Sequence, residues 1–265
     1  MRLDDDYANA AYIDGAEDYP DTWAIDAREF REVEVACGRA RMNQPYGNGF
    51  EYDLFQPSAR PVGTVIFVHG GYWKAFDRKD WSHFGAGVME HDWAFAVPSY
   101  PLAPAATVPE ITVCIRQAVE AVADATVGPI VLVGHSAGGH LVARMAMEDV
   151  GLRTDVVDRI THIVPISPVG DLRDLMETSM ADVLGLRMDI AILESPTLRT
   201  NDIGKPVTVW VGADERPKFL EQAQNLAKAW DCNHVVSQGR HHFDVIDDLK
   251  DADGRLVQLL TGGQT

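Results

Sequence analysis

The chain has 265 residues, 46% of them hydrophobic, and its 40 acidic and 23 basic side chains give a formal net charge of −17. This hydrophobic share is typical of a globular protein with a sizeable core, and it excludes disordered, collagen-like and small disulfide-stapled proteins. Because so acidic a surface repels phosphates, we expect a small-molecule partner and neither nucleic acid nor a membrane.

The chain predicts one domain in a reducing compartment. Its length is common for a single α/β domain, and no Pro/Gly/Ser-rich linker divides residues 1–265. Cys37, Cys114 and Cys232 are an odd number at unpatterned spacings, which favours neither a disulfide framework nor a Cys-x-x-Cys site. No signal-peptide pattern or membrane-length apolar run is found. We therefore expect a cytoplasmic protein and leave a homodimer open.

The first residues, about 1–60, differ in pattern from the rest. Tyr46-Gly47-Asn48-Gly49 is a hairpin-type turn sequence between REVEVACGRA and FEYDLFQP. These two flanking runs are predicted to pair as antiparallel strands. An N-terminal segment with an antiparallel strand pair is therefore expected before the main sheet.

Beyond this segment, short β-branched runs alternate with amphipathic runs. This pattern predicts an α/β fold with a parallel sheet covered by helices on both faces. Helices are expected over residues 109–125 and from Gly138 and Lys218, with a terminal helix starting near Asp244. The predicted strands are Thr64–His69, Trp93–Val97, Pro129–Gly134, His162–Ile166, Val207–Gly212 and a weaker one at His234–Ser237.

The most informative motif joins the third of these core strands to a helix. Gly134-His135-Ser136-Ala137-Gly138 has the Gly-x-Ser-x-Gly pattern of a nucleophile elbow, in the strand-turn-helix context that such an elbow needs. Glycines flank the serine because the turn is too tight for side chains. The pattern alone also fits an inert turn, but this context favours Ser136 as a nucleophile. The N–H of Ala137 is then positioned to stabilise negative charge.

A second glycine motif follows an earlier strand, in His69-Gly70-Gly71-Tyr72-Trp73. On its own this motif is more often a plain turn, with His69 as a structural hydrogen-bonding residue. Its place upstream of an elbow favours an oxyanion hole, in which the N–H groups of Gly70 and Gly71 act with that of Ala137.

A serine nucleophile needs a base, and the base needs an orienting acid. Asp214 and Glu215 follow one predicted strand, and His241 and His242 follow the next. The order Ser, acid, His is that of α/β hydrolases and differs from the chymotrypsin and subtilisin orders. Spacing alone leaves both adjacent pairs open. No metal-binding pattern is found, so no metal or cofactor is expected.

The motifs HGGYW, GHSAGGH and HHFDVI together resemble those of the serine-type kynurenine formamidases, or arylformamidases, and their close α/β-hydrolase relatives. HGGYW is the specific part, because esterases similar to hormone-sensitive lipase usually carry HGGG there. The metal-dependent bacterial formamidases have a different motif, which this chain lacks. The resemblance implies an α/β-hydrolase fold with a mostly parallel central sheet, helices on both faces and a small helical cap at about residues 171–200.

The resemblance also ranks the adjacent pairs. Relatives place the acid three residues after a glycine and follow it with x-Pro-x-Phe, which implies Glu215 first and Asp214 as the second choice. The histidine before Phe-Asp-Val-Ile is His242, which leaves His241 as the spare. Where relatives often read Ile-Ser-Gly, this chain has Pro168, and we expect this change to alter the pocket wall.

The activity implied by the resemblance is N-formylkynurenine-type deformylation: a serine hydrolase removes a small acyl group from an aryl amide through an acyl-enzyme. The aryl group needs a flat apolar slot, for which Tyr72, Trp73 and Phe243 are candidates, together with Phe76 and Trp81. Trp73 could instead buttress the oxyanion loop. One alternative is a short-acyl carboxylesterase or thioesterase. Another is a non-catalytic hydrolase-fold receptor, disfavoured because nucleophile, acid and base are all present.

Overall fold

The computed structural model describes residues 3–262. Within them a single eight-stranded sheet has the order β1-β2-β4-β3-β5-β6-β7-β8. The strands from β3 onward run parallel to one another, whereas β2 is antiparallel to both β4 and β1. The strands are β1 (Ala40–Gly47), β2 (Phe50–Phe55), β3 (Gly63–Val68), β4 (Trp93–Pro98), β5 (Ile130–His135), β6 (Ile160–Ile166), β7 (Thr208–Gly212) and β8 (Asn233–Ser237).

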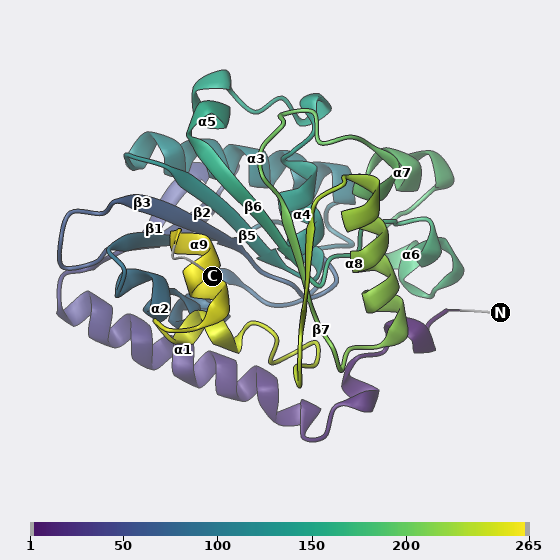
Figure 1. Cartoon of the computed structure of the whole chain (residues 1–265), viewed down its shortest axis with the longest axis horizontal. Coiled ribbons are helices and arrows are strands. Elements are labelled where there is room, and N and C mark those ends of the chain that lie inside the picture. The colour runs from purple at the N-terminus through teal and green to yellow at the C-terminus, as the bar shows by residue number, and fades with distance from the viewer. Residues whose placement is uncertain (1–2, 263–265) are drawn as a thin grey trace.

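Helices cover both faces of this sheet, which confirms the predicted α/β architecture (Figure 1). The strands β3, β4 and β5 are buried along their whole length, because successive side chains point to opposite faces of the sheet and helices cover both faces. Ile66 and Leu132 belong to one core and Phe67 and Val133 to the other. The helices are α1 (Tyr19–Ala36), α2 (Ala86–Met89), α3 (Val108–Ala125), α4 (Ala137–Arg144), α5 (Thr154–Arg159), α6 (Met180–Val183), α7 (Met188–Leu193), α8 (Pro217–Ala229) and α9 (Arg255–Thr261).

The N-terminal region departs from its prediction. An antiparallel pair is present, but its first strand is β1, and most of the REVEVACGRA run lies in α1. The alternating valines and charges in this run resemble a strand. However, Trp23, Ala27 and Glu34 lie on one helical face and are buried against the domain. The first strand was therefore predicted one element too early.

The C-terminal prediction was also too early. A turn follows Asp244, whose carboxylate accepts the His241 N–H at 2.7 Å, and α9 begins only at Arg255. The intervening chain forms a short 3-10 helix at Asp247–Lys250 and then a turn at residues 251–253. Gly254 is extended, with φ −60° and ψ 138°, so the chain does not run on as one helix here.

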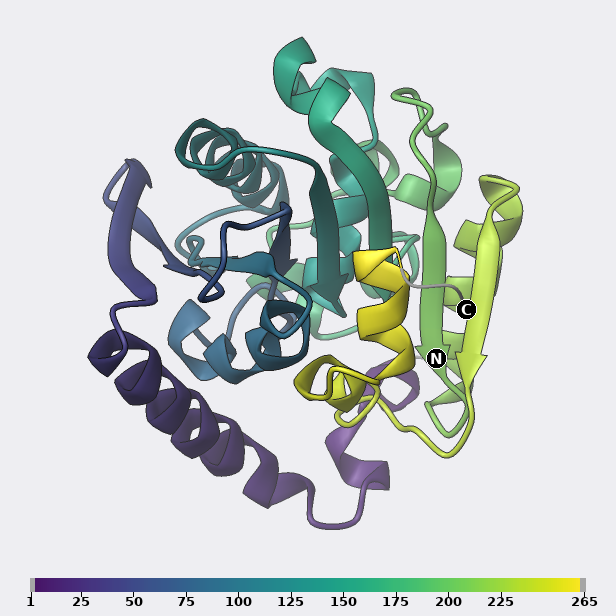
Figure 2. The same cartoon turned by 60° about the vertical axis from the view of Figure 1, so that its left-hand side comes forward.

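Two irregular segments flank the carboxyl ends of the strands. Residues 171–200 contain α6, α7 and two 3-10 helices, at Asp174–Glu177 and Pro196–Leu198. The chain before α1 forms three further 3-10 turns and lies beyond the lower ends of β7 and β8 in Figure 2. It is anchored there by Tyr7, whose hydroxyl accepts a hydrogen bond from Gln222 Nε2 at 2.8 Å. No helix within residues 3–262 is both long and apolar enough to cross a membrane.

Candidate active site

The chain turns sharply between β5 and α4 at Ser136. This serine has φ 55° and ψ −115°, a conformation that non-glycine residues rarely adopt. A Cβ on Gly134 would lie 2.2 Å from the Gly138 carbonyl oxygen, and a Cβ on Gly138 would lie 1.9 Å from that of Val68. Neither position therefore accepts a side chain. The turn holds Ser136 at the carboxyl edge of the sheet and at the N-terminus of α4.

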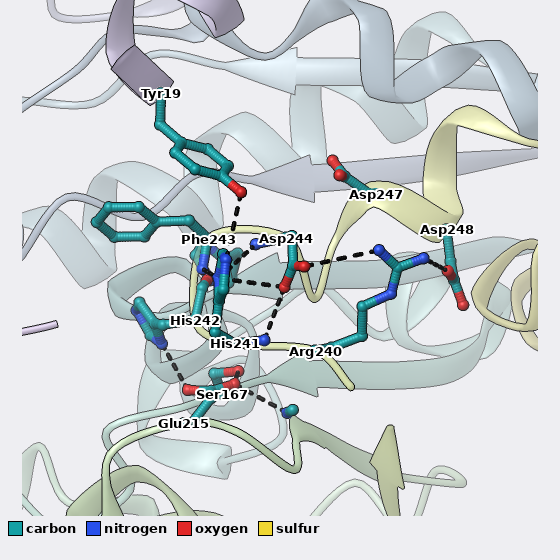
Figure 3. Close-up of polar contacts among 12 residues, drawn as sticks. Tyr19, Ser167, Glu215, Arg240, His241, His242, Phe243, Asp244, Asp247 and Asp248 are labelled. Carbon is teal, nitrogen blue, oxygen red and sulfur yellow. Dashed lines mark hydrogen bonds and ion pairs between the residues drawn. The ribbon is translucent and has the colours of Figure 1, made fainter. Parts of the chain in front are cut away.

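Glu215 and His242 come from the neighbouring loops after β7 and β8 and meet in a buried contact (Figure 3). His242 Nδ1 lies 2.6 Å from Glu215 Oε2. Because a carboxylate only accepts hydrogen bonds, the imidazole proton is on Nδ1, which leaves Nε2 free to act as a base. The other carboxylate oxygen, Oε1, accepts the Gly212 N–H at 2.9 Å and the hydroxyl of Ser167.

Ser167 is a positioning residue that sequence reasoning missed. It directly follows β6, is completely buried and has φ 47°. The Ile166-Ser167-Pro168 segment was expected to alter the pocket wall. Instead it lies at the acid, and no residue of 167–172 lines the cavity beside Ser136. Its position directly after a core strand was the available signal.

The two residues left as spares have other surroundings. Asp214 is exposed, and its backbone N–H donates to the Arg240 carbonyl oxygen at 2.9 Å. His241 is only partly buried, and its Nε2 lies 3.3 Å from the hydroxyl of Tyr19 in α1 (Figure 3). His241 thus links the loop of His242 to the first helix.

His135 connects the elbow to the same loop. It is buried, and its Nε2–H donates to the His242 carbonyl oxygen at 2.9 Å. Burial, and then the nearby His242, hold the pKa of His135 well below its ordinary value. His135 is therefore a neutral donor that fixes the backbone of His242 relative to the serine turn.

The glycine loop after β3 lies beside Ser136. Gly71 has φ 109° and lines the cavity, whereas Gly70 packs against His135 and Ser136. Within residues 3–262 the N–H groups of Gly71 and Ala137 have no protein acceptor. His69 is buried, its Nδ1–H donates to the Gly70 carbonyl oxygen at 2.8 Å, and burial lowers its pKa to about 4. His69 therefore shapes the loop as a neutral residue.

A cavity of about 440 Å³ opens beside Ser136 and His242, a size ordinary for small-molecule sites. Its wall is mainly apolar and comes from the N-terminal region, the chain after β3, the turn after β5 and the loop after β8. The lining residues are Ala10, Ala16, Glu17, Pro20, Trp23, Gly71, Tyr72, Lys74, Ala75, Phe76, Trp81, His135, Ser136, His242 and Phe243. The cap-like residues 171–200 do not line it.

Among the predicted substrate-binding aromatics, Tyr72 and Phe243 line this cavity and Trp73 does not. Trp73 has no exposed surface, and its ring packs edge-on against His140 with centroids 5.1 Å apart. The expectation that Trp73 lines the slot is corrected, because a fully buried ring cannot contact substrate. Its alternative role as a buttress of the glycine loop fits. Sequence reasoning did not single out Trp23, which reaches the cavity from α1.

No three His, Cys, Asp or Glu side chains of the described residues lie close enough together to hold a metal ion.

Residues 65–235 match a family model described as an alpha/beta hydrolase fold. The chain is similar to kynurenine formamidases from Danio rerio (30% identity over 83% of this chain and 80% of the relative) and Salmo salar (27%, over 92% and 89%). It is also similar to a Silicibacter crystal structure, provisionally assigned as a thioesterase (TM-score 0.96, 51% identity, over 98% and 99%).

Proposed function

The chain belongs to the α/β-hydrolase family, and we propose that it deformylates aryl formamides of the N-formylkynurenine type. The observation that carries the proposal is the buried Glu215–His242 pair, whose histidine lines the same apolar cavity as Ser136 and Gly71 of the glycine loop. Similarity to kynurenine formamidases along most of the chain supports the choice of substrate.

In the first half of the proposed reaction, the Ser136 hydroxyl attacks the formyl carbon and gives its proton to Nε2 of His242. Glu215 stabilises the resulting imidazolium through Nδ1. The N–H groups of Gly70, Gly71 and Ala137 stabilise the oxyanion. The C–N bond then breaks, the His242 proton passes to the leaving aryl amine, and a formyl-serine ester remains.

In the second half, a water molecule gives a proton to His242 and its oxygen attacks the formyl-serine carbon. Collapse of this intermediate breaks the ester bond, returns the proton to Ser136 and releases formate. The cavity suits these two reaction steps because a formyl group needs little space beside Ser136, whereas the aryl amine contacts the apolar wall of the cavity. Phe243 and Tyr72 supply part of that wall.

The proposal is tested by following N-formylkynurenine hydrolysis by the purified protein, with Ser136→Ala as the blank. We expect rapid, serine-dependent release of formate and of the aryl amine. A fluorophosphonate probe should label the native protein and not the variant. Formamide turnover equal to that of the Ser136→Ala blank would rule the proposal out.

The second candidate is a short-acyl ester or thioester hydrolase with the same nucleophile. Its support is the 51% identity to the Silicibacter structure, whose provisional thioesterase assignment concerns that protein. Relative kcat/KM separates the two candidates, because cleavage of activated phenyl esters is common to both. Serine-dependent thioester cleavage without deformylation would favour this second candidate.

We further propose that the enzyme works in the cytoplasm. Cys37, Cys114 and Cys232 are all free, and Cys37 is exposed, as suits a reducing compartment. Fractionation of the source cells followed by immunodetection tests this location.

A further inference from the structure

The mouth of the catalytic cavity carries one anionic and one cationic side chain that the proposed reaction does not use. Glu17 and Lys74 both line the cavity and are both exposed. In the described part of the chain neither has an ion-pair or side-chain hydrogen-bond partner, and they do not pair with each other. By contrast, Lys218 and Lys250 each pair with a neighbouring carboxylate. An unpaired cation and anion thus stand at one opening.

Lys74 is held by the glycine loop itself. Its backbone N–H donates to the Gly71 carbonyl oxygen at 3.0 Å. The two residues between them, Tyr72 and Trp73, have φ of 52° and 57°, and such left-handed conformations at non-glycine residues are maintained only by strong surrounding contacts. The loop that approaches Ser136 therefore also fixes where the Lys74 side chain starts.

Glu17 comes from the N-terminal segment, in the 3-10 helix Ala16–Asp18. That segment is tied to the same loop. The Tyr72 hydroxyl donates to the Tyr7 carbonyl oxygen and accepts from Asn9 Nδ2 at 3.0 Å. Beside Glu17, Ala16 is buried. The two charges therefore line one cavity, on segments that contact each other.

Besides these charges and Ser136, the cavity wall contains four aromatic side chains, those of Trp23, Phe76, Trp81 and Phe243. A ligand that fills the cavity would place its reacting group at Ser136, a flat apolar body along this wall, and its far end at the mouth. A far end with separate positive and negative groups matches the unpaired Glu17 and Lys74. N-Formylkynurenine has this layout, because its aryl ring carries a side chain ending in an ammonium and a carboxylate.

We propose that Lys74 binds the carboxylate, and Glu17 the ammonium, of an aryl formamide bearing a zwitterionic amino-acid group. The inference rests on the proposed deformylation and adds the residues that select this substrate class. Charge-assisted contacts at a solvated mouth contribute modestly, so we expect about a fivefold to tenfold effect for each residue. The effect should appear in KM, because the charged end lies far from the bond that breaks.

The test compares two substrates that share the ring, ketone and formamide. One is N-formylkynurenine, and the other is 2-formamidoacetophenone, which lacks the amino-acid group. The variants are Lys74→Met and Glu17→Gln. Lys79→Met is the matched control, because Lys79 is also an exposed lysine without an ion pair in residues 3–262 but does not line the cavity.

We expect each cavity variant to lower the kcat/KM ratio of the zwitterionic to the neutral substrate about fivefold to tenfold, through KM. Added salt should raise KM for N-formylkynurenine with the wild type and less so with Lys74→Met. Lys79→Met should leave the ratio unchanged.

Two results would overturn the inference. In the first, both formamides are cleaved in a serine-dependent way, but Lys74→Met and Glu17→Gln leave the kcat/KM ratio of the two substrates unchanged. This result would refute the charge recognition and leave the proposed deformylation intact. In the second, the wild type cleaves neither formamide, which would refute both the charge recognition and the proposed deformylation.

Discussion

Replacement of Glu215 by Gln should abolish most activity because of the way its carboxylate is held. Oε1 accepts two donors, the Gly212 N–H and the Ser167 hydroxyl. In Glu215→Gln the amide oxygen must take that position, because an NH₂ group there would meet two donors. The NH₂ group then faces His242 Nδ1, which has to become an acceptor.

This change forces the imidazole proton onto Nε2, so His242 can no longer take a proton from Ser136. Such a tautomer error costs about 10⁴-fold in kcat in a Ser-His-Asp triad, or roughly 5 kcal/mol of transition-state stabilisation. We therefore expect kcat for N-formylkynurenine, or for an activated phenyl ester if that is the better substrate, to fall about 10³-fold to 10⁴-fold. Stopped-flow or steady-state absorbance measures this loss.

Asp214→Asn is the matched control, since Asp214 is exposed and its backbone N–H, not its carboxylate, donates to the Arg240 carbonyl oxygen. It should keep kcat within about twofold, as expected for a surface change. Thermal unfolding should show that Glu215→Gln is folded, because it preserves shape. Glu215 would not be the orienting acid if Glu215→Gln retained a tenth of the wild-type activity. The same conclusion would follow if Asp214→Asn lost as much activity as is expected for Glu215→Gln.

Three further outcomes are expected. Ser167→Ala removes one charge-assisted hydrogen-bond donor from Glu215, worth about 1.5–3 kcal/mol, so kcat should fall about tenfold or more. Ser167→Thr should recover part of this loss. An unchanged kcat in Ser167→Ala would show that the Gly212 N–H alone is enough to hold the Glu215 carboxylate. Gly138→Ala should lower the free energy of unfolding by about 3 kcal/mol in urea titrations, because the new Cβ would lie 1.9 Å from the Val68 carbonyl oxygen; equal stability would contradict this steric reading. Burial lowers the pKa of His69 to about 4 and of His140 to about 3, so stability should fall as pH drops from about 6.5 toward these values, where the unfolded chain binds protons that the native protein refuses. At pH 5 each histidine should cost up to about 2 kcal/mol relative to pH 7.5, with a shallower slope in His140→Gln, and a flat urea stability across this range would refute the assignment.

The local pattern of apolar and polar residues was sufficient to predict most strands and helices of the α/β core. The β-branched runs and the helix over residues 109–125 were found within a few residues of their observed ends, because each carries its own periodicity. Periodicity likewise predicted the strand before and the helix after the Gly-x-Ser-x-Gly sequence, and that context indicated the sharp turn at Ser136. By contrast, α1 was missed because its valines and charges resemble a strand until packing against the domain selects the helical face of Trp23 and Ala27.

The tertiary structure decided which side chains meet at the site. Asp214 and Glu215 are neighbours with similar chemistry, and only the path of the loop after β7 buries one against His242 and leaves the other in solvent. Likewise, Ser167 reaches the acid from the end of another strand, and residues near Glu17 line the same cavity as Ser136, which lies more than a hundred positions away in the chain. Such contacts depend on how distant segments pack, and the one-dimensional spacing of residues carries no record of that packing.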